Sequence, residues 1–131
     1  MATLTLNWQG DLKFASAPGS PPIELHSSTP NVTSPTQALA YAVMGCMAMD
    51  VVHVIQKHRH ELRALSVTFQ SKRAETYPKR YTAIHLHFDI TGEIPDEVVT
   101  RAIELSRTTY CSVSNSLRED IEFKTSFTVH Q

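Results

Sequence analysis

The sequence lacks the features that mark nucleic-acid binders, disulfide-rich proteins and repeat proteins. Its 131 residues carry a formal net charge of −1, so there is no electrostatic reason to expect nucleic acid or an anionic membrane as a partner. It contains 2 cysteines, too few for a disulfide scaffold, and no internal repeat or low-complexity tract. Because no basic stretch followed by an apolar one opens the chain, we expect no signal peptide and a cytoplasmic location.

The two cysteines stand in different surroundings. Cys46 lies within an apolar run over residues 38–55, and Cys111 opens a segment over residues 110–117 that is typical of a short helix. The absence of a CxxC excludes a thioredoxin-type motif and a zinc site built from neighbouring thiols. Two interpretations remain. Both cysteines are small core residues, or they form a redox pair whose Cα atoms the fold brings within about 7 Å.

The apolar run over residues 38–55 is close to the length of a transmembrane helix, which needs about 20 residues. It contains Asp50 and His53, and charged groups are costly inside a bilayer. A helix that is apolar on nearly every side is otherwise a core helix that protein covers all round. One chain of this size supplies limited cover, so we expect a buried central helix in an obligate homodimer without a membrane.

The rest of the pattern predicts one domain, over residues 1–131, of the α+β class. Strands are expected over residues 3–8, 12–15, 22–26, 62–74, 80–91 and 121–129, with a turn at Gly10-Asp11 and a loop over 27–33. Helices are expected over residues 35–58, 94–110 and 110–117. The resulting order, β-β-β-α-β-β-α-α-β, indicates an α+β fold rather than an alternating parallel βαβ fold.

The sequence also predicts how the first helix begins and which face of the second helix is buried. Ser34 and Gln37 are placed to form a capping box around Pro35 at the start of the first helix. The second helix should bury Val98, Ala102 and Leu105.

Three polar or thiol side chains share one face of the apolar helix. Cys46, Asp50 and His53 are spaced i, i+4, i+7. A buried aspartate needs a partner, so Asp50 and His53 form a structural polar pair, or they orient and activate the Cys46 thiol as base and orienter. Metal binding is a third interpretation, but the face supplies only three ligands. We expect no metal and no cofactor.

Other candidates have simpler explanations. His85 and His87 lie on one face of a strand, where a polar strand face is a simpler explanation than a metal site. The methionines Met44, Met47 and Met49 line an adaptable apolar pocket or fill a dimer core. Aromatic residues at strand positions are expected in the core or in subunit contacts; these are Trp8, Phe14, Phe69, Phe88 and Phe123.

Two segments resemble a known family. Residues 34–52 (SPTQALAYAVMGCMAMDVV) are similar to the segment around the first cysteine of the OsmC/Ohr family of osmotically inducible and organic hydroperoxide resistance proteins. Residues 108–117 (TTYCSVSNSL) resemble the segment around its second cysteine. The order of elements also agrees, so the resemblance covers nearly the whole chain.

The resemblance implies an OsmC-like fold in an intertwined homodimer with long helices at its centre. It also implies a thiol-dependent peroxidase. Cys46 would attack an organic hydroperoxide to give a sulfenic acid, and Cys111 would condense with it to a disulfide that a thiol reductant opens. We therefore expect the two sulfurs to lie close together.

The chain departs from the peroxidases at two positions. They supply an arginine from the N-terminal strands and a glutamate in the first turn of the central helix, whereas the first arginine here is Arg59 and Thr36 matches the glutamate. Lys13 lacks the planar fork of an arginine. The pattern is closer to the less characterised OsmC-like branch. The alternative to a peroxidase is an OsmC-like dimer that binds an apolar ligand or responds to redox changes with little turnover.

The lack of an arginine in the N-terminal strands affects how readily the two thiols ionise. Cys111 at a helix start would have its thiolate favoured by the helix dipole, whereas Cys46 inside a helix needs a cation. Asp50 disfavours a nearby thiolate. Protonated His53, or an arginine from the later strands or a second subunit, would substitute; the candidates are Arg63, Arg73 and Arg80. We expect Cys46 to react with peroxides more slowly than in complete family members.

Overall fold

The computed structural model describes residues 2–27 and 29–131; Met1 and Ser28, the latter in the loop predicted over 27–33, lie outside them. The chain forms two compact units, Met1–Tyr41 and Ala42–Gln131, and each is described by itself. Helix α1 (Pro35–Lys57) begins in the first unit and ends in the second. One domain over the whole chain stays a prediction.

The first unit contains a three-stranded antiparallel sheet in the order β1-β2-β3. Its strands are β1 (Leu6–Trp8), β2 (Lys13–Ser16) and β3 (Glu24–His26). They begin later than predicted, most clearly β1. The turn predicted at Gly10-Asp11 is confirmed, and both residues have positive φ angles, 95° and 48°, a region that glycine enters freely and aspartate tolerates.

This first unit buries little apolar surface. Among its described residues, His26 alone is buried. Trp8 and Phe14 are 67% and 40% exposed, so a place for them in the core of this chain is wrong, while their role as subunit contacts stays a prediction. Other large apolar side chains of the unit are also exposed, namely Leu4, Leu6, Leu12 and Ile23.

The start of α1 follows from its sequence. The backbone N–H of Gln37 donates to Ser34 Oγ at 3.3 Å, and the N–H of Ser34 donates to Gln37 Oε1 at 3.0 Å. These reciprocal bonds satisfy donors that the first helical turn leaves unpaired. The predicted capping box is confirmed.

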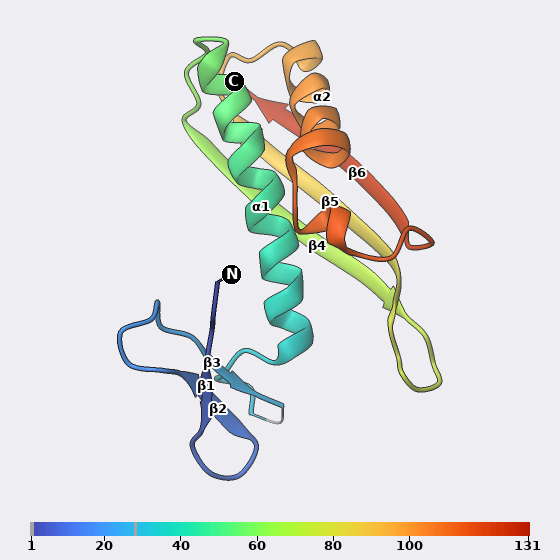
Figure 1. Ribbon diagram of the computed structural model, residues 1–131. Coiled ribbons are helices and arrows are strands. Elements are labelled where there is room, and N and C mark those ends of the chain that lie inside the picture. The colour runs from blue at the N-terminus through green and yellow to red at the C-terminus, as the bar shows by residue number, and fades with distance from the viewer. Residues whose placement is uncertain (1, 28) are drawn as a thin grey trace. The chain divides into compact units, whose positions relative to one another are not determined.

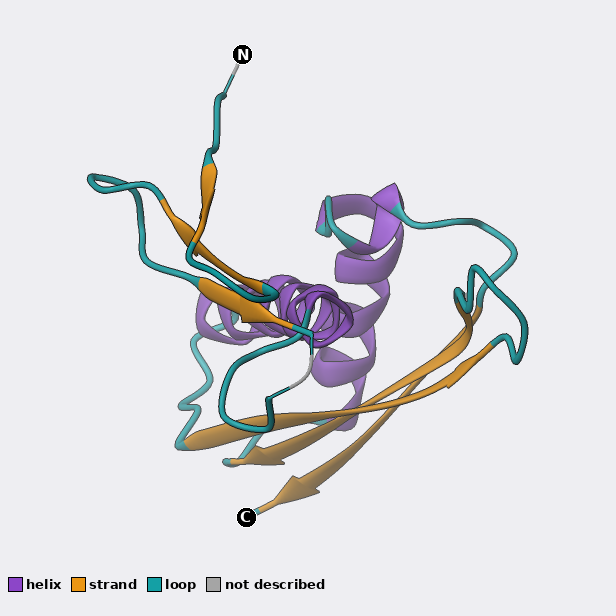
Figure 2. Ribbon diagram, turned by 90° about the horizontal axis from the view of Figure 1, so that it is seen from below, coloured by secondary structure: helices purple, strands orange, loops and turns teal. Residues whose placement is uncertain are grey.

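The second unit is a sheet in the order β4-β5-β6 with helices on one of its faces (Figures 1 and 2). Strand β4 (Ala64–Arg73) runs antiparallel to β5 (Tyr81–Thr91), and β5 runs parallel to β6 (Glu122–His130). Helix α2 (Asp96–Leu105) lies in the connection between β5 and β6. The α+β class is confirmed, and the one parallel βαβ crossover is a feature that the element order did not indicate.

The core of the second unit follows the predicted periodicities. Alternate residues of β5 point at the helices and are buried, whereas His85 and His87 lie on the other face. On α2 the buried residues are Val99, Ala102 and Ile103. Val98 and Leu105 are only half-buried, because the helix presents a face rotated from the predicted one. Helix α1 and strand β5 supply most of the remaining core: Val43, Met47, Val51, Val54, Ile55, Ile84, Leu86, Phe88 and Ile90.

Helix α1 is not covered all round within one chain. Its length and composition alone would suit a membrane span, as they would a core helix, and 28% of its most apolar 18-residue window is buried. Tyr41 and Met49 are 65% and 73% exposed. The complete burial expected for this helix is not seen in the structure of the single chain, and its cover by a second subunit stays a prediction.

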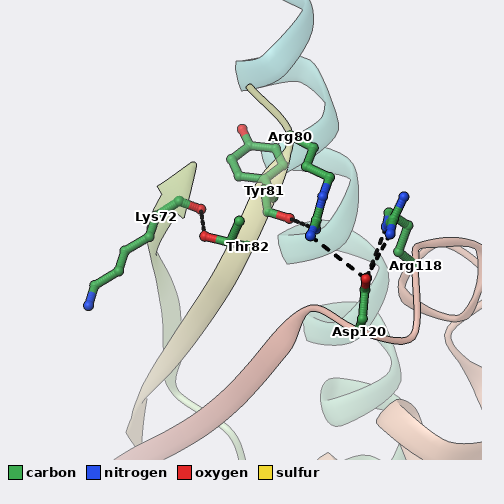
Figure 3. Close-up of polar contacts among 6 residues, drawn as sticks. All are labelled: Lys72, Arg80, Tyr81, Thr82, Arg118 and Asp120. Carbon is green, nitrogen blue, oxygen red and sulfur yellow. Dashed lines mark hydrogen bonds and ion pairs between the residues drawn. The ribbon is translucent and has the colours of Figure 1, made fainter. Parts of the chain in front are cut away.

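Ion pairs around Asp120 tie the segment before β6 to the start of β5 (Figure 3). Arg118 donates to both carboxylate oxygens, from Nε at 2.9 Å and from Nη2 at 2.7 Å. Arg80 Nη2 lies 3.7 Å from the same carboxylate, and its Nη1 donates to the carbonyl of Tyr81 at 3.2 Å. The hydrogen bond from Arg118, aided by the charges of both guanidinium groups, lowers the pKa of Asp120 to about 2.

Candidate thiol site

The structure brings Cys46 and Cys111 together. Both are free thiols, and the Cys46 side chain is a hydrogen-bond and charge neighbour of Cys111 that acts on its pKa. The expected proximity of the two side chains is confirmed. Cys111 is fully buried, whereas Cys46 is half-buried. Of the two sulfurs, Cys46 is the one that a reagent from solvent can reach.

A local widening of the helix positions Cys111. The helix predicted over residues 94–110 is α-helical only to Leu105 and continues as a π-helical segment, Ser106–Tyr110. The backbone N–H of Cys111 donates to the carbonyl of Ser106 at 2.8 Å, the i to i+5 spacing of a π turn, a feature often found at functional sites. Cys111 itself is extended, with φ −75° and ψ 99°.

The predicted helix over residues 110–117 is a single 3-10 turn, Ser114–Ser116. Cys111 therefore does not stand in the first turn of a helix, and the expected dipole assistance to its thiolate is wrong. Burial instead raises the pKa of the Cys111 thiol, the nearby Ser114 hydroxyl and the hydrogen bond from the Ser114 backbone N–H lower it in part, and Cys46 raises it further. Cys111 is thus a neutral thiol at neutral pH.

Two side chains that sequence reasoning missed hold this turn in place. Asn115 Nδ2 donates to the carbonyl of Cys111 at 2.8 Å and to the carbonyl of Arg107 at 2.9 Å. Ser106 Oγ donates to Asp50 Oδ2 on α1 at 2.8 Å. The role of Asn115 could have been inferred only from its position in the segment TTYCSVSNSL, four residues after Cys111.

The structure places Asp50 and His53 in different environments. Asp50 is half-buried and accepts its hydrogen bond from Ser106, while His53 is exposed. Within residues 2–27 and 29–131, no hydrogen bond or ion pair joins Cys46, Asp50 and His53 to one another. The geometry agrees with a structural role for Asp50, but its partner is Ser106 rather than His53. Activation of Cys46 by this pair stays a prediction.

A cavity of ≈ 550 Å³ is lined by residues of α1 and of the segment from Leu105 to Tyr110, and the described residues that line it include neither cysteine. Asp50, on its wall, is one helical turn beyond Cys46, and Tyr110 precedes Cys111 in the chain. The lining combines apolar and ionisable side chains: Asp50, His53, Val54, Lys57, His58, Leu105 and Tyr110. The predicted methionine pocket differs from it, because Met47 is buried in the core and Met49 is largely exposed.

The arginines considered as substitute cations are engaged elsewhere in this chain or exposed. Arg80 pairs with Asp120, and Arg73 Nε donates to the carbonyl of Lys79 at 2.8 Å. Arg63 is exposed, and its backbone N–H pairs with the carbonyl of Thr91 at 2.9 Å. Among the described residues, no cation contributes to the pKa of Cys111.

The strand histidines form a polar ladder. His85 Nε2 and His87 Nδ1 lie 2.8 Å and 2.7 Å from the same hydroxyl oxygen, Ser126 Oγ. His87 Nε2 also lies 3.1 Å from Thr128 Oγ1. In the part of the chain that the structure describes, no group of three His, Cys, Asp or Glu side chains is placed to hold a metal ion. The ladder agrees with a polar strand face.

Comparison with known proteins identifies the family. Residues 28–126 match the family described as OsmC-like protein. The chain belongs to the OsmC-like family. Protein YhfA of Escherichia coli strain K12 is 35% identical to it over 127 residues, or 95% of each chain. The resemblance to the OsmC/Ohr family is thereby confirmed.

Solved structures agree with the OsmC-like fold. A hypothetical protein from Aquifex aeolicus VF5 has a TM-score of 0.89 at 25% identity, covering 98% of this chain and 96% of that one. An organic hydroperoxide resistance protein OsmC from Legionella pneumophila has a TM-score of 0.74 at 21% identity, covering 98% of each chain. The second similarity concerns the fold alone.

Proposed function

We propose that the protein reduces organic hydroperoxides with the Cys46 and Cys111 pair. The observation that carries the proposal is the contact between a half-buried and a fully buried thiol in an OsmC-like chain. Accessibility favours Cys46 as the thiol that meets the peroxide. The enclosed Cys111 then has Cys46 as its immediate reaction partner.

The proposed chemistry balances in three steps. The Cys46 thiolate attacks the hydroperoxide, the O–O bond breaks, and a proton converts the departing alkoxide to an alcohol, leaving a sulfenic acid on Cys46. Cys111 then gives up its thiol proton and attacks the Cys46 sulfur, so that the S–S bond forms as the S–O bond of the sulfenic acid breaks, and the departing hydroxide takes up that proton and leaves as water. An external dithiol reduces the disulfide and is itself oxidised, which suits the reducing cytoplasm.

We place the organic part of the substrate in the cavity that Asp50 and Tyr110 line. Its apolar lining residues, Val54 and Leu105, would contact an alkyl chain, and the ring of Tyr110 lies on the same wall. The carboxylate of Asp50 would hold Ser106, and through it the π-helical segment, rather than act on the peroxide. Asp50 and His53 are supporting residues in this proposal.

An intertwined homodimer forms part of the same proposal. The exposed apolar side chains of α1, Tyr41 and Met49, and the exposed aromatic residues of the first unit, Trp8 and Phe14, need cover. Monomeric proteins rarely leave such surfaces open. A second copy would place the long helices at the centre of the dimer and would supply new side chains around Cys46, including any substitute cation.

The second candidate function is a ligand-binding or redox-responsive dimer with little turnover. The observation that favours it is the set of missing partners: the first arginine is Arg59, Thr36 matches the expected glutamate, and no cation among the described residues acts on Cys111. Because a neighbouring cation makes a cysteine more reactive, Cys46 without one would react slowly. The same cavity would then hold an apolar ligand.

Thiol titration after one equivalent of an alkyl hydroperoxide distinguishes the two candidates. The peroxidase loses both thiols within seconds and regains them with a dithiol. Cys111→Ser should lose its one thiol at a similar rate and stop at the sulfenic acid, whereas Cys46→Ser should not react. Retention of both thiols over an hour in the wild-type protein would favour the ligand-binding dimer.

A further inference from the structure

The hydroxyl of Ser114 is buried without a hydrogen-bond partner. Ser114 is 2% exposed, and its Oγ is the one buried side-chain oxygen or nitrogen in the described part of the chain that makes no hydrogen bond. Native proteins pair the large majority of such atoms, because an unsatisfied buried hydroxyl is costly. An exception beside a reactive group calls for a functional explanation.

That reactive group is Cys111, three residues earlier. The backbone N–H of Ser114 donates to Cys111 Sγ at 3.3 Å, and the Ser114 hydroxyl is close enough to act on the same sulfur. A neutral thiol is a weak acceptor, which explains why the hydroxyl lacks a hydrogen bond in the reduced protein. A thiolate is a much stronger acceptor for the same O–H.

We propose that the hydroxyl and the backbone N–H of Ser114 form a two-donor site that stabilises the Cys111 thiolate when the Cys46–Cys111 disulfide closes or opens. The hydroxyl is unsatisfied while Cys111 is a neutral thiol and gains an acceptor when the sulfur is charged, whereas the N–H donates to the sulfur in both states. The proposal rests on the proposed thiol chemistry for its purpose, but the stabilisation itself needs no peroxide.

The role follows from the electrostatics of the turn. Cys111 is fully buried, and among the described residues no cation acts on it. Neutral donors are therefore the only groups in this turn that favour the charged form. When Cys111 attacks the Cys46 sulfenic acid, its proton passes to the departing hydroxide, and the sulfur must carry negative charge as the S–S bond forms. Ser114 acts on that sulfur directly.

The first test is a spectroscopic titration of Cys111 in Cys46→Ser protein, by the ultraviolet absorbance of the thiolate, since a buried sulfur is poorly accessible to alkylating reagents. Ser114→Ala removes the hydroxyl and keeps the backbone N–H. It should raise the pKa of Cys111 by about one unit, the size expected for the loss of a hydrogen bond to a charged group. Ser114→Thr, which keeps a hydroxyl, should restore most of the shift.

The matched control is Ser112→Ala. Ser112 is exposed in the same turn, and among the described residues its hydroxyl makes no hydrogen bond with Cys111. This variant should leave the titration unchanged. If Ser114→Thr fails to fold, Ser114→Gly replaces it as a second removal of the hydroxyl and should shift the titration as Ser114→Ala does.

A purely structural role for Ser114 predicts that Ser114→Ala lowers the melting temperature and leaves the titration of Cys111 unchanged. Removal of an unsatisfied buried hydroxyl should leave the melting temperature unchanged or raised, whereas loss of a needed structural hydrogen bond would lower it. An unchanged Cys111 titration in Ser114→Ala, or an equal shift in Ser112→Ala, would overturn the proposal.

The second test addresses the reaction. With both cysteines present and one equivalent of alkyl hydroperoxide, Ser114→Ala should form the Cys46 sulfenic acid at the wild-type rate. Disulfide closure should be about tenfold slower at neutral pH, because one pKa unit is a tenfold loss of thiolate. A dimedone trap would then capture more sulfenic acid. If no sulfenic acid forms in the wild-type protein, the peroxidase proposal fails, while the titration of Cys111 still decides the role of Ser114.

If Ser114→Ala shifts the titration of Cys111 but leaves the rate of disulfide formation unchanged, the role of Ser114 in disulfide formation is contradicted.

Discussion

The two compact units of the chain differ in how they satisfy their apolar side chains. Among the described residues, all the buried hydrophobic ones lie between Val43 and Cys111, in the second unit. The first unit has a single buried residue among those described, His26, and exposes most of its large apolar side chains. A sheet of three short strands offers little area for a core of its own. The second unit contains an apolar core, whereas the described residues of the first bury no apolar side chain.

The largest expected effect comes from a matched pair of phenylalanines. Phe88→Ala in the second unit empties a fully buried site on β5 and should lower the free energy of unfolding by about 3–5 kcal/mol. Phe14→Ala in the first unit, where the ring is 40% exposed, should cost well under half of that. Denaturant unfolding of both variants measures the two losses of unfolding free energy. Equal losses would contradict the difference in burial between the two units.

The next prediction concerns assembly. If a second copy covers the first unit, Trp8→Ala should weaken the dimer by about 2 kcal/mol, or roughly thirtyfold in the dissociation constant. Sedimentation over a concentration series measures this change. The control is Tyr77→Ala, which removes an 86% exposed aromatic side chain from the second unit and should leave association unchanged. A wild-type protein that stays a folded monomer at low micromolar concentration would refute the dimer.

Two glycines extend the comparison to backbone conformation. A Cβ on Gly92 would lie 2.6 Å from the carbonyl oxygen of Glu61, at a φ of +153°, whereas a Cβ on Gly10 would meet nothing within 4 Å, at a φ of +95°. Gly92→Ala should destabilise by about 1–3 kcal/mol from strain and the clash with backbone. Gly10→Ala carries backbone strain alone and should cost less. Thermal melts of the two variants give the order, and a larger loss for Gly10→Ala would contradict it.

The smallest effects are expected from surface ion pairs. Asp120 is exposed, and its pKa is lowered to about 2 by Arg118 and Arg80. A carboxyl with a depressed pKa stabilises the folded state above its unfolded pKa of 3.8 and loses that contribution as the pH falls toward 2. Asp120→Asn should reduce stability slightly at pH 7 and not at pH 2. In the first unit, Glu24→Gln breaks a 3.6 Å pair with Lys13 and should have a similarly small effect. An Asp120→Asn loss that persists at pH 2 would show that the charge is not its cause.

Sequence periodicity predicted the second unit better than the first. The alternation in β5 and the capping box of α1 set those elements within a residue or two. The first and third strands of the first unit were predicted too long, because local pattern does not show how much pairing a small sheet can support. Of the site, proximity of Cys46 and Cys111 was inferred from the family resemblance, while Ser106, Ser114 and Asn115 were missed. Hydroxyl and amide side chains are common in turns, and nothing in their spacing shows which buried atom they face.

By itself, the sequence determined the family, the α+β class and the two thiols, since these depend on local periodicity, capping residues and short segments around each cysteine. Only the tertiary structure decided three further features. The parallel pairing of β5 with β6 depends on the path of the chain through α2. The direction of the pKa shift of Cys111 depends on burial and on its neighbours Ser114 and Cys46. The partner of Asp50 is a serine 56 positions away in sequence. Each is a long-range property, because burial and hydrogen-bond partners are set by residues distant in the chain.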